Sequence, residues 1–362
     1  MTLLLIISIF IVLIYCFFIG YIITHIKLNF SKSESPIAKV SILIPCRNEA
    51  KNIANCLRSI AWQTLPINQY DIIIIDDFSE DDTVKIATEF KNKLPLTILH
   101  NSMPGKKNAL ALGINHAVND CIITTDADCT MEKDWLKSML YSFENRNLKM
   151  LCGPVNLKSD GSFFQNLQQT ESAAIVGISA TMLNIRKPAT CNGANLMFSR
   201  AAFKELNGYG NHQQLASGDD DLLLHTFYRQ DATRVGYELN YNAMVYPAAC
   251  KNFAEFLNQR SRWLSKRKFY AYPWNSRLQG LIVIQLLTFY SLLIIALSTG
   301  HLLAIALILN KYLFDLMLGV KLKRVFNFKY LQILLMPFYE FYIVIVLVYA
   351  RFSKIKWKGR GV

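Results

Sequence analysis

Residues 121–128 read Cys-Ile-Ile-Thr-Thr-Asp-Ala-Asp, an apolar and β-branched run followed at once by two carboxylates one residue apart. The run predicts a short buried strand over residues 121–125, with Asp126 and Asp128 at its carboxyl end. In an open α/β sheet, ligands bind outside the carboxyl ends of the strands, and two carboxylates there suit Mg²⁺ or Mn²⁺ carrying a diphosphate. Neighbouring acids also occur in solvated turns, so the interpretation of this pair as a cation site depends on the other polar clusters in the sequence.

The same arrangement occurs upstream, where the buried strand predicted over residues 72–75 ends in Asp76 and Asp77. A first strand over residues 40–44 likewise ends in a polar segment, Pro45 to Glu49. Helices predicted over 51–63, from 82 onward and over 106–118 alternate with these strands and with a strand over 96–99. This alternation predicts an α/β fold with a mixed, mostly parallel sheet between residues 31 and 275.

Apolar segments flank this region, in a chain of 362 residues that is 52% hydrophobic. Residues 3–26 carry no Asp, Glu, Lys or Arg and are long enough to cross about 30 Å of hydrocarbon. Further apolar segments cover residues 278–309, 311–320 and 330–350. We therefore expect an N-terminal transmembrane anchor over 1–30, a cytoplasmic α/β domain over 31–275, and transmembrane or interfacial helices with a basic tail over 276–362.

The basic residues predict the orientation of the chain in the membrane. Lys27, Lys32 and Lys39 follow the first apolar segment, so the positive-inside rule places the α/β domain in the cytoplasm and the chain in the inner (plasma) membrane as a multi-pass protein. Three C-terminal spans would put the basic tail on the opposite side, against this rule. One segment, either that of Lys311 or that of Glu340, is therefore a candidate to lie in the interface or to re-enter.

The net charge of +13 is concentrated beside the C-terminal apolar segments, which favours anionic lipid as a partner and gives no sign of nucleic-acid binding. We expect membrane-surface contacts for the basic side chains of Arg260, Lys266, Arg267 and Lys268. The eight cysteines lack C-x-x-C spacing, so they are interpreted as reduced and mostly buried thiols, with no zinc site.

Six segments occur in an order that resembles the family 2 glycosyltransferases: 41–49, 76–79, 105–106, 126–128, 218–221 and 259–263. The resemblance covers about Val40 to Trp263 and is to membrane-anchored, inverting members related to hyaluronan, chitin and cellulose synthases. It implies a GT-A fold, a nucleotide-diphosphate sugar as donor, with a UDP-sugar as the first candidate, and Mg²⁺ or Mn²⁺ as cofactor. Phe78, where relatives usually carry glycine, and Asp219, where many carry glutamate, depart from the family pattern.

The resemblance also implies roles at the donor site. Asp77, with Asp76, would receive the base and ribose, while Asp126 and Asp128 would hold the cation, with Asp128 the more direct ligand. The remaining nucleotide-sugar contacts expected are Pro45, Arg47, Glu49, Lys106, Gln259, Arg262 and Trp263. The alternative for Asp76 or Asp77 is a cap on the helix that begins near Asp82.

By the same resemblance Asp220 would be the general base, since one carboxylate suffices for an inverting transfer. Asp219, Asp221, Asn192 and Gly193 would lie on the acceptor side. Three consecutive acids also suit an exposed helix start, so their register stays open. His212, in the loop before the acids, is interpreted as a surface residue.

We expect a membrane-bound inverting transferase that moves a sugar to a hydroxyl of a lipid-linked or polysaccharide acceptor. The alternatives are single addition to a polyprenyl or glycolipid acceptor instead of processive synthesis, or a non-catalytic transporter or scaffold that binds nucleotide sugar. Other membrane proteins of cell-envelope polysaccharide or glycolipid synthesis are candidate partners.

Overall fold

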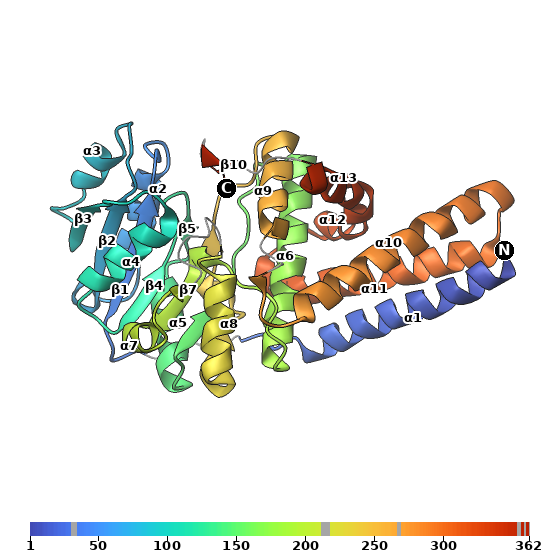
Figure 1. Cartoon of the computed structure of the whole chain (residues 1–362), viewed down its shortest axis with the longest axis horizontal. Helices are drawn as coiled ribbons and strands as arrows, with labels where there is room; N and C mark the ends of the chain where they lie inside the picture. Colours follow the sequence, from blue (N-terminus) through green and yellow to red (C-terminus); the bar gives the residue numbers. More distant parts are fainter. Residues whose placement is uncertain (30–34, 211–217, 266–268, 353–355, 358–359, 362) are drawn as a thin grey trace.

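The computed structural model describes residues 1–29, 35–210, 218–265, 269–352, 356–357 and 360–361. A seven-stranded sheet lies at the centre of the described α/β domain, in the order β3-β2-β1-β4-β7-β6-β8 (Figure 1). Its strands are β1 Val40–Cys46, β2 Tyr70–Asp76, β3 Leu96–His100, β4 Cys121–Thr124, β6 Met150–Cys152, β7 Leu196–Ser199 and β8 Val235–Tyr237. Outside it, β5 (Thr130–Met131) pairs with β9 (Val245–Tyr246), and β10 (Lys356–Trp357) pairs with β11 (Arg360–Gly361).

The sheet is mixed and mostly parallel, which confirms the sequence-based prediction. Strand β1 runs parallel to β2 and β4, β2 parallel to β3, and β6 parallel to β8, whereas β7 is antiparallel to both β4 and β6. In register, Cys46 lies opposite Asp76 and Leu43 opposite Thr124. The carboxyl ends of β1, β2 and β4 therefore meet at one edge of the sheet.

Helices cover both faces of the sheet, because successive strand residues point to opposite sides. In β2, Ile73 and Ile75 pack into one core cluster, and Ile72 and Ile74 into the other. The helices of this region are α2 Ile53–Ala61, α3 Thr83–Thr88, α4 Lys106–His116, α5 Trp135–Asn145, α6 Phe163–Asn184, α7 Arg200–Glu205, α8 Asp221–Gln230 and α9 Phe253–Ser265, with short 3₁₀ turns at Ile67–Gln69, Gly193–Asn195, Ala232–Arg234 and Tyr241–Ala243.

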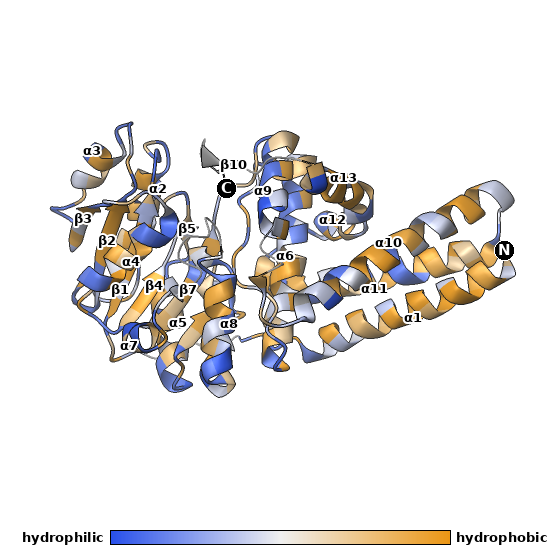
Figure 2. Ribbon diagram, viewed as in Figure 1, coloured by the Kyte–Doolittle hydropathy of each residue, from blue (hydrophilic) through white to orange (hydrophobic). Residues whose placement is uncertain are grey.

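Three long apolar helices pack against one another and extend away from the sheet. They are α1 (Thr2–His25), α10 (Trp274–Thr299) and α11 (Leu302–Phe326), and Figures 1 and 2 show them side by side, largely apolar, with the N-terminus at their far end. Gly300, in the left-handed conformation with φ 63°, ends α10, and the chain turns there into α11. By length and composition, four described segments are long and apolar enough to cross a membrane.

The fourth of these segments is interrupted. It consists of α12 (Tyr330–Ile333), a 3₁₀ turn over Met336–Phe338 that contains Pro337, and α13 (Tyr339–Phe352). The 14 residues of α13 rise only about 21 Å, less than the roughly 30 Å of hydrocarbon. Helix α13 packs on α9, beside the α/β domain (Figure 1).

The ionisable residues that made this region hard to interpret from sequence form one buried cluster. The Lys311 ammonium lies 2.5 Å from Asp315 Oδ2 and 2.7 Å from Glu340 Oε1. Tyr15 donates a hydrogen bond of 2.6 Å to the other oxygen of Asp315. These contacts tie α1, α11 and α13 together, and they pair charges that would be costly if left alone in an apolar surrounding.

Candidate active site

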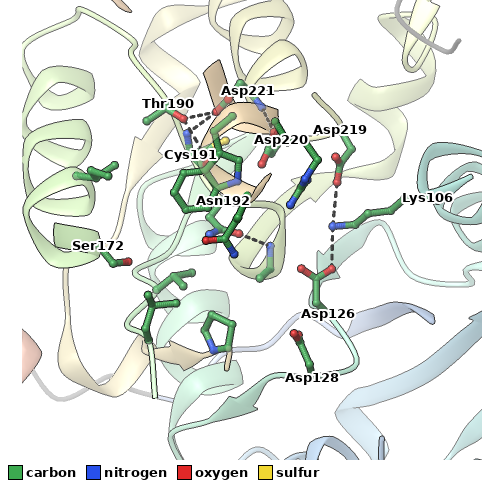
Figure 3. Close-up of a pocket in the computed structure, with 18 of the residues that line it drawn as sticks. Lys106, Asp126, Asp128, Ser172, Thr190, Cys191, Asn192, Asp219, Asp220 and Asp221 are labelled. Carbon is green, nitrogen blue, oxygen red and sulfur yellow. Dashed lines mark hydrogen bonds and ion pairs between the residues drawn. The ribbon is translucent and has the colours of Figure 1, made fainter. Parts of the chain in front are cut away.

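A cavity of about 370 Å³ opens at the carboxyl ends of β1, β2 and β4 and continues toward α6, α9 and the start of α10. Most residues expected at the site line it together: Pro45, Arg47, Glu49, Asp77, Lys106, Asp126, Asp128, Asn192, Asp219, Asp220, Asp221, Gln259, Arg262 and Trp263. Figure 3 shows how acids from two separate segments, 126–128 and 219–221, face this space. Among the described lining residues, Asp76 and Gly193 are the two expected members that do not appear.

Lys106 links the D-x-D pair to the acidic triplet. Its Nζ lies 2.7 Å from Asp126 Oδ1 and 3.1 Å from Asp219 Oδ2 (Figure 3). Burial alone would lower the pKa of Lys106, but the negative charges of Asp126 and Asp219 outweigh it, so the net pKa is raised. The lysine is therefore a fixed cation between the two acidic parts of the cavity.

Asp77 anchors the β2 end of the cavity to the start of α4. Its Oδ1 accepts hydrogen bonds from Asn101 Nδ2 at 2.8 Å and from the amide of Gly105 at 2.9 Å. The helix near Asp82 has Asp82 itself as N-cap, so the alternative of a cap from Asp77 does not describe this site. Gly105 has φ 126°, a conformation that glycine adopts readily and other residues rarely do. It is the N-cap of α4, whose first residue is Lys106.

The turn after β2 explains both Asp76 and the unusual Phe78. Asp76 accepts from the amide of Ser79 at 3.2 Å and lies 3.6 Å from His100 Nδ1, so its carboxylate holds the turn after β2. Phe78 has φ 61°, a left-handed conformation that costs a non-glycine residue about 1 kcal/mol. This geometry gives a physical reason why glycine suits the position.

The three consecutive acids have three different environments. Asp219 pairs with Lys106. Asp220 is the N-cap of α8 and accepts from the amides of Asp221 at 2.7 Å and Gly193 at 3.3 Å. Asp221 is 1% exposed and accepts from Thr190, Cys191 and Tyr270. The helix-start interpretation is correct for Asp220, and the same geometry fixes that carboxylate at the cavity.

Gly193 lies directly behind these acids. Its carbonyl accepts from Thr124 Oγ1 at 2.7 Å, which attaches the 190–195 loop to β4. A Cβ at this position would lie 3.0 Å from Asp219 Oδ2 and 3.6 Å from Lys106 Nζ. The absence of a side chain at Gly193 thus leaves room for the Lys106–Asp219 pair.

Helix α9 presents Gln259, Arg262 and Trp263 to the cavity from its last two turns. The prediction of a membrane-surface role for Arg260 is wrong: this side chain is 6% exposed, forms an ion pair with Glu171 of α6, and stacks 4.3 Å from the centroid of Trp263. Its guanidinium therefore supports the indole from behind. Lys266, Arg267, Lys268 and His212 lie outside the described residues.

Sequence reasoning missed the wall of the cavity that faces the apolar helices. It consists of Ser172, Ile175, Val176 and Ser179 from α6, Tyr270, and Gln279 from α10. The buried residues of α6 are not confined to one face of the helix, so α6 lacks the one-sided apolar pattern by which a helix is predicted from sequence. No motif marks Tyr270 or Gln279.

The donor set fits a divalent cation held with a diphosphate. Asp126 and Asp128 supply hard oxygen ligands in one cavity. No group of three or more His, Cys, Asp or Glu side chains gathers at a possible metal position within the part of the chain that the structure describes. Two carboxylates leave most positions of an octahedral ion to water and phosphate oxygens, the coordination that Mg²⁺ prefers.

The fold has the architecture of the GT-A glycosyltransferases. A mannosyltransferase from Pyrobaculum calidifontis, solved in complex with GDP-Man and Mn²⁺, superimposes with a TM-score of 0.60 at 18% identity, and the match covers 98% of each chain. This similarity concerns the fold alone.

Residues 41–206 match the family model described as Glycosyl transferase family 2. The glycosyltransferase AglE of Haloferax volcanii is 26% identical over 63% of this chain and 72% of its own length. The poly-beta-1,6-N-acetyl-D-glucosamine synthase of Staphylococcus epidermidis is 27% identical over 66% of this chain, and the chain spans 57% of that relative's length. The match assigns residues 41–206 to glycosyltransferase family 2, so the chain carries a glycosyltransferase domain.

Proposed function

We propose that this chain is a membrane-bound, inverting glycosyltransferase that moves a sugar from a nucleotide-diphosphate sugar to a hydroxyl of a membrane-associated acceptor. The observation that carries the proposal is the single cavity lined by Asp77, Asp126, Asp128, Asp220 and Trp263. This one cavity would offer hydrogen-bond acceptors to the nucleoside, carboxylates to the cation that carries the diphosphate, and a base to the acceptor hydroxyl.

The donor would lie along the carboxyl edge of the sheet. Asp77 would receive the nucleoside, and Arg262 would contact the diphosphate through its guanidinium. Asp126 and Asp128 would hold Mg²⁺ or Mn²⁺, which when bound neutralises charge on the departing diphosphate. Trp263, held by the stacked Arg260, would pack against the sugar or base.

Asp220 would act as the general base. Its two oxygens accept hydrogen bonds from the amides of Gly193 and Asp221, which fix the carboxylate at the cavity. The carboxylate would remove the proton of the acceptor hydroxyl as that oxygen bonds to the anomeric carbon. The bond from this carbon to the diphosphate breaks on the opposite face, and its electron pair leaves with the nucleoside diphosphate. A single displacement of this kind inverts the anomeric configuration.

The acceptor would approach along α6 and α10. Ile175 and Val176 give this wall an apolar surface, and Gln279 belongs to an apolar helix long enough to span a membrane. This favours single addition to a lipid-linked acceptor, such as a polyprenyl or glycolipid, over extension of a polysaccharide. Processive synthesis stays the second candidate because the Gln259-to-Trp263 motif resembles that of polysaccharide synthases.

We also propose how the chain is arranged in the membrane. Residues 1–30 would form the anchor, 31–275 the cytoplasmic catalytic domain, and 276–362 the C-terminal membrane region, in the inner (plasma) membrane. Helices α1, α10 and α11 would cross the bilayer, and α12 and α13 would lie in its interface. The short, interrupted α12–α13 segment supports this arrangement, which leaves the basic tail on the same side as the catalytic domain.

The decisive experiment incubates membranes containing the full chain with a panel of radiolabelled nucleotide sugars, UDP-sugars first and GDP-mannose next, with and without EDTA. Transfer to a lipid-extractable product is expected, and it should require the cation. An Asp220→Asn variant should lose at least about a hundredfold in rate and still bind the nucleotide. Binding without transfer in the wild type would instead favour a non-catalytic nucleotide-sugar transporter or scaffold.

A further inference from the structure

The buried carboxylate of Asp221 joins three segments of the chain on the acceptor side of the cavity. One oxygen accepts hydrogen bonds from the Thr190 hydroxyl and, at 2.9 Å, from the Cys191 amide (Figure 3). The other accepts from the hydroxyl of Tyr270 at 2.8 Å. With 1% of its surface exposed, Asp221 has its carboxylate directed at these donors.

These contacts connect the proposed base to its surroundings. Asp221 is the first residue of α8, and its own amide donates to Asp220 at 2.7 Å. Asp220 in turn accepts from Gly193, so the 190–193 loop is attached to the start of α8 at both of its ends. The loop and the base therefore share one hydrogen-bonded frame.

Tyr270 extends this frame toward the membrane region. It lines the cavity and precedes α10, which begins at Trp274. Its ring packs 5.2 Å from that of His225 on α8. Burial, and then the charge of Asp221, raises the pKa of the Tyr270 hydroxyl, so this group stays a hydrogen-bond donor at neutral pH.

We propose that the hydrogen bond between Tyr270 and Asp221 forms a brace. This brace couples the start of α10 to the positions of Asp220 and of the 190–193 loop. The proposal rests on the proposed function and assigns Asp221 a positioning role in place of direct contact with the acceptor. Asp77, Asp126 and Asp128 lie after other strands and do not contact Asp221 or Tyr270 in the hydrogen bonds given above, so loss of the brace should affect the acceptor side more than the donor side.

The test compares three variants of the full-length chain in detergent: Tyr270→Phe, Asp221→Asn and the double variant. Tyr272→Phe is the matched control, because Tyr272 lies on the same segment and packs through its ring against His225 and Tyr228. Hydrogen exchange is measured on the peptide covering residues 188–195. Affinity for UDP and for GDP is measured with Mn²⁺, and transfer is measured as a function of acceptor concentration.

Faster exchange of the 188–195 peptide is expected in Tyr270→Phe and Asp221→Asn, and the double variant should show no more than the larger single effect. Nucleotide affinity should stay within about twofold, while transfer at a fixed acceptor concentration falls about tenfold, as expected for one hydrogen bond to a charged group. Tyr272→Phe should match the wild type.

The brace is refuted if nucleotide affinity falls as much as transfer, if the two single effects simply add, or if Tyr272→Phe behaves like Tyr270→Phe. Unchanged exchange in Tyr270→Phe refutes it as well. Failure of the proposed function gives a different result, because the wild type then transfers no sugar at all, and the exchange data alone decide whether the brace exists.

Discussion

The Nζ of Lys106 lies 2.7 Å from Oδ1 of Asp126, so the first acid of the D-x-D pair is held by a lysine in this structure. The same ammonium contacts Asp219 at 3.1 Å. A divalent cation at Asp126 would have to share or displace this lysine, and a diphosphate would offer the lysine another partner. The arrangement favours joint entry of cation and donor.

Replacing Lys106 by Gln should therefore have opposite effects on two ligands. Affinity for Mn²⁺ in the absence of nucleotide should rise about tenfold at low ionic strength, since a positive charge beside the carboxylates is removed. Affinity for the nucleoside diphosphate should fall. Both are measured by titration calorimetry, with free Mn²⁺ checked by electron paramagnetic resonance.

The exposed Lys91, changed to Gln, is the matched control for total charge. An unchanged affinity of the Lys106→Gln variant for Mn²⁺ alone would mean that the lysine does not compete with the cation.

Strands β2 and β4, with the acids that end them, could be predicted from the sequence because a buried parallel strand is an uninterrupted apolar run that ends in a polar turn. The runs before Asp76 and Asp126 have this form. The α6 wall and Tyr270 could not be predicted, because their contacts depend on segments far apart in the chain, as Tyr270 and Asp221 show. Arg260 was misjudged for the same reason: its partner Glu171 lies on another helix.

Breaking the Glu171–Arg260 pair should destabilise the protein and disturb Trp263. The pair is largely buried, with 13% and 6% of the side chains exposed, and removal of one partner leaves the other charge without compensation. We expect Arg260→Met to lower the free energy of unfolding by about 3 kcal/mol. The double variant Glu171→Leu/Arg260→Met should recover much of this loss. Chemical denaturation of the detergent-solubilised chain measures both.

Arg260→Lys separates the two roles of the guanidinium. Lysine keeps the charge toward Glu171 but lacks the planar group that stacks on Trp263. The rate of sugar transfer should therefore fall, while the free energy of unfolding should change less than in Arg260→Met. Equal transfer in Arg260→Lys and the wild type would show that Trp263 needs no support from this side chain.

Acidification should destabilise the protein through His225. This side chain is 2% exposed on α8, and its Nε2 lies 3.2 Å from the carbonyl of Ala189. Burial lowers the pKa of His225 below 6.5, although Asp221 and the Ala189 carbonyl oppose the shift. Below pH 6.5 His225 binds a proton more readily in the unfolded chain than in the folded chain, so the free energy of unfolding falls as the pH falls.

The slope from this one group cannot exceed about 1.4 kcal/mol per pH unit. Thermal unfolding between pH 7 and pH 5 should show a smaller loss in His225→Gln than in the wild type. The exposed His116, changed to Gln, serves as control and should retain the wild-type dependence. Parallel pH profiles of wild type and His225→Gln would contradict the assignment.

The membrane arrangement can be tested by the side from which single cysteines react. Phe352 is 81% exposed at the end of α13, and His301 lies in the turn between α10 and α11. With three crossings, Phe352→Cys should react from the same side as Lys91→Cys on the α/β domain, and His301→Cys from the opposite side.

Labelling by an impermeant maleimide is compared between intact cells and inside-out vesicles. The labelling of the parent chain, which has eight cysteines, is subtracted as background. Four crossings would place Phe352→Cys with His301→Cys instead. We expect three crossings because the α12–α13 segment is interrupted: α13 alone has 14 residues and rises about 21 Å, and Pro337 lacks the amide hydrogen that a continuous helix across the bilayer would use.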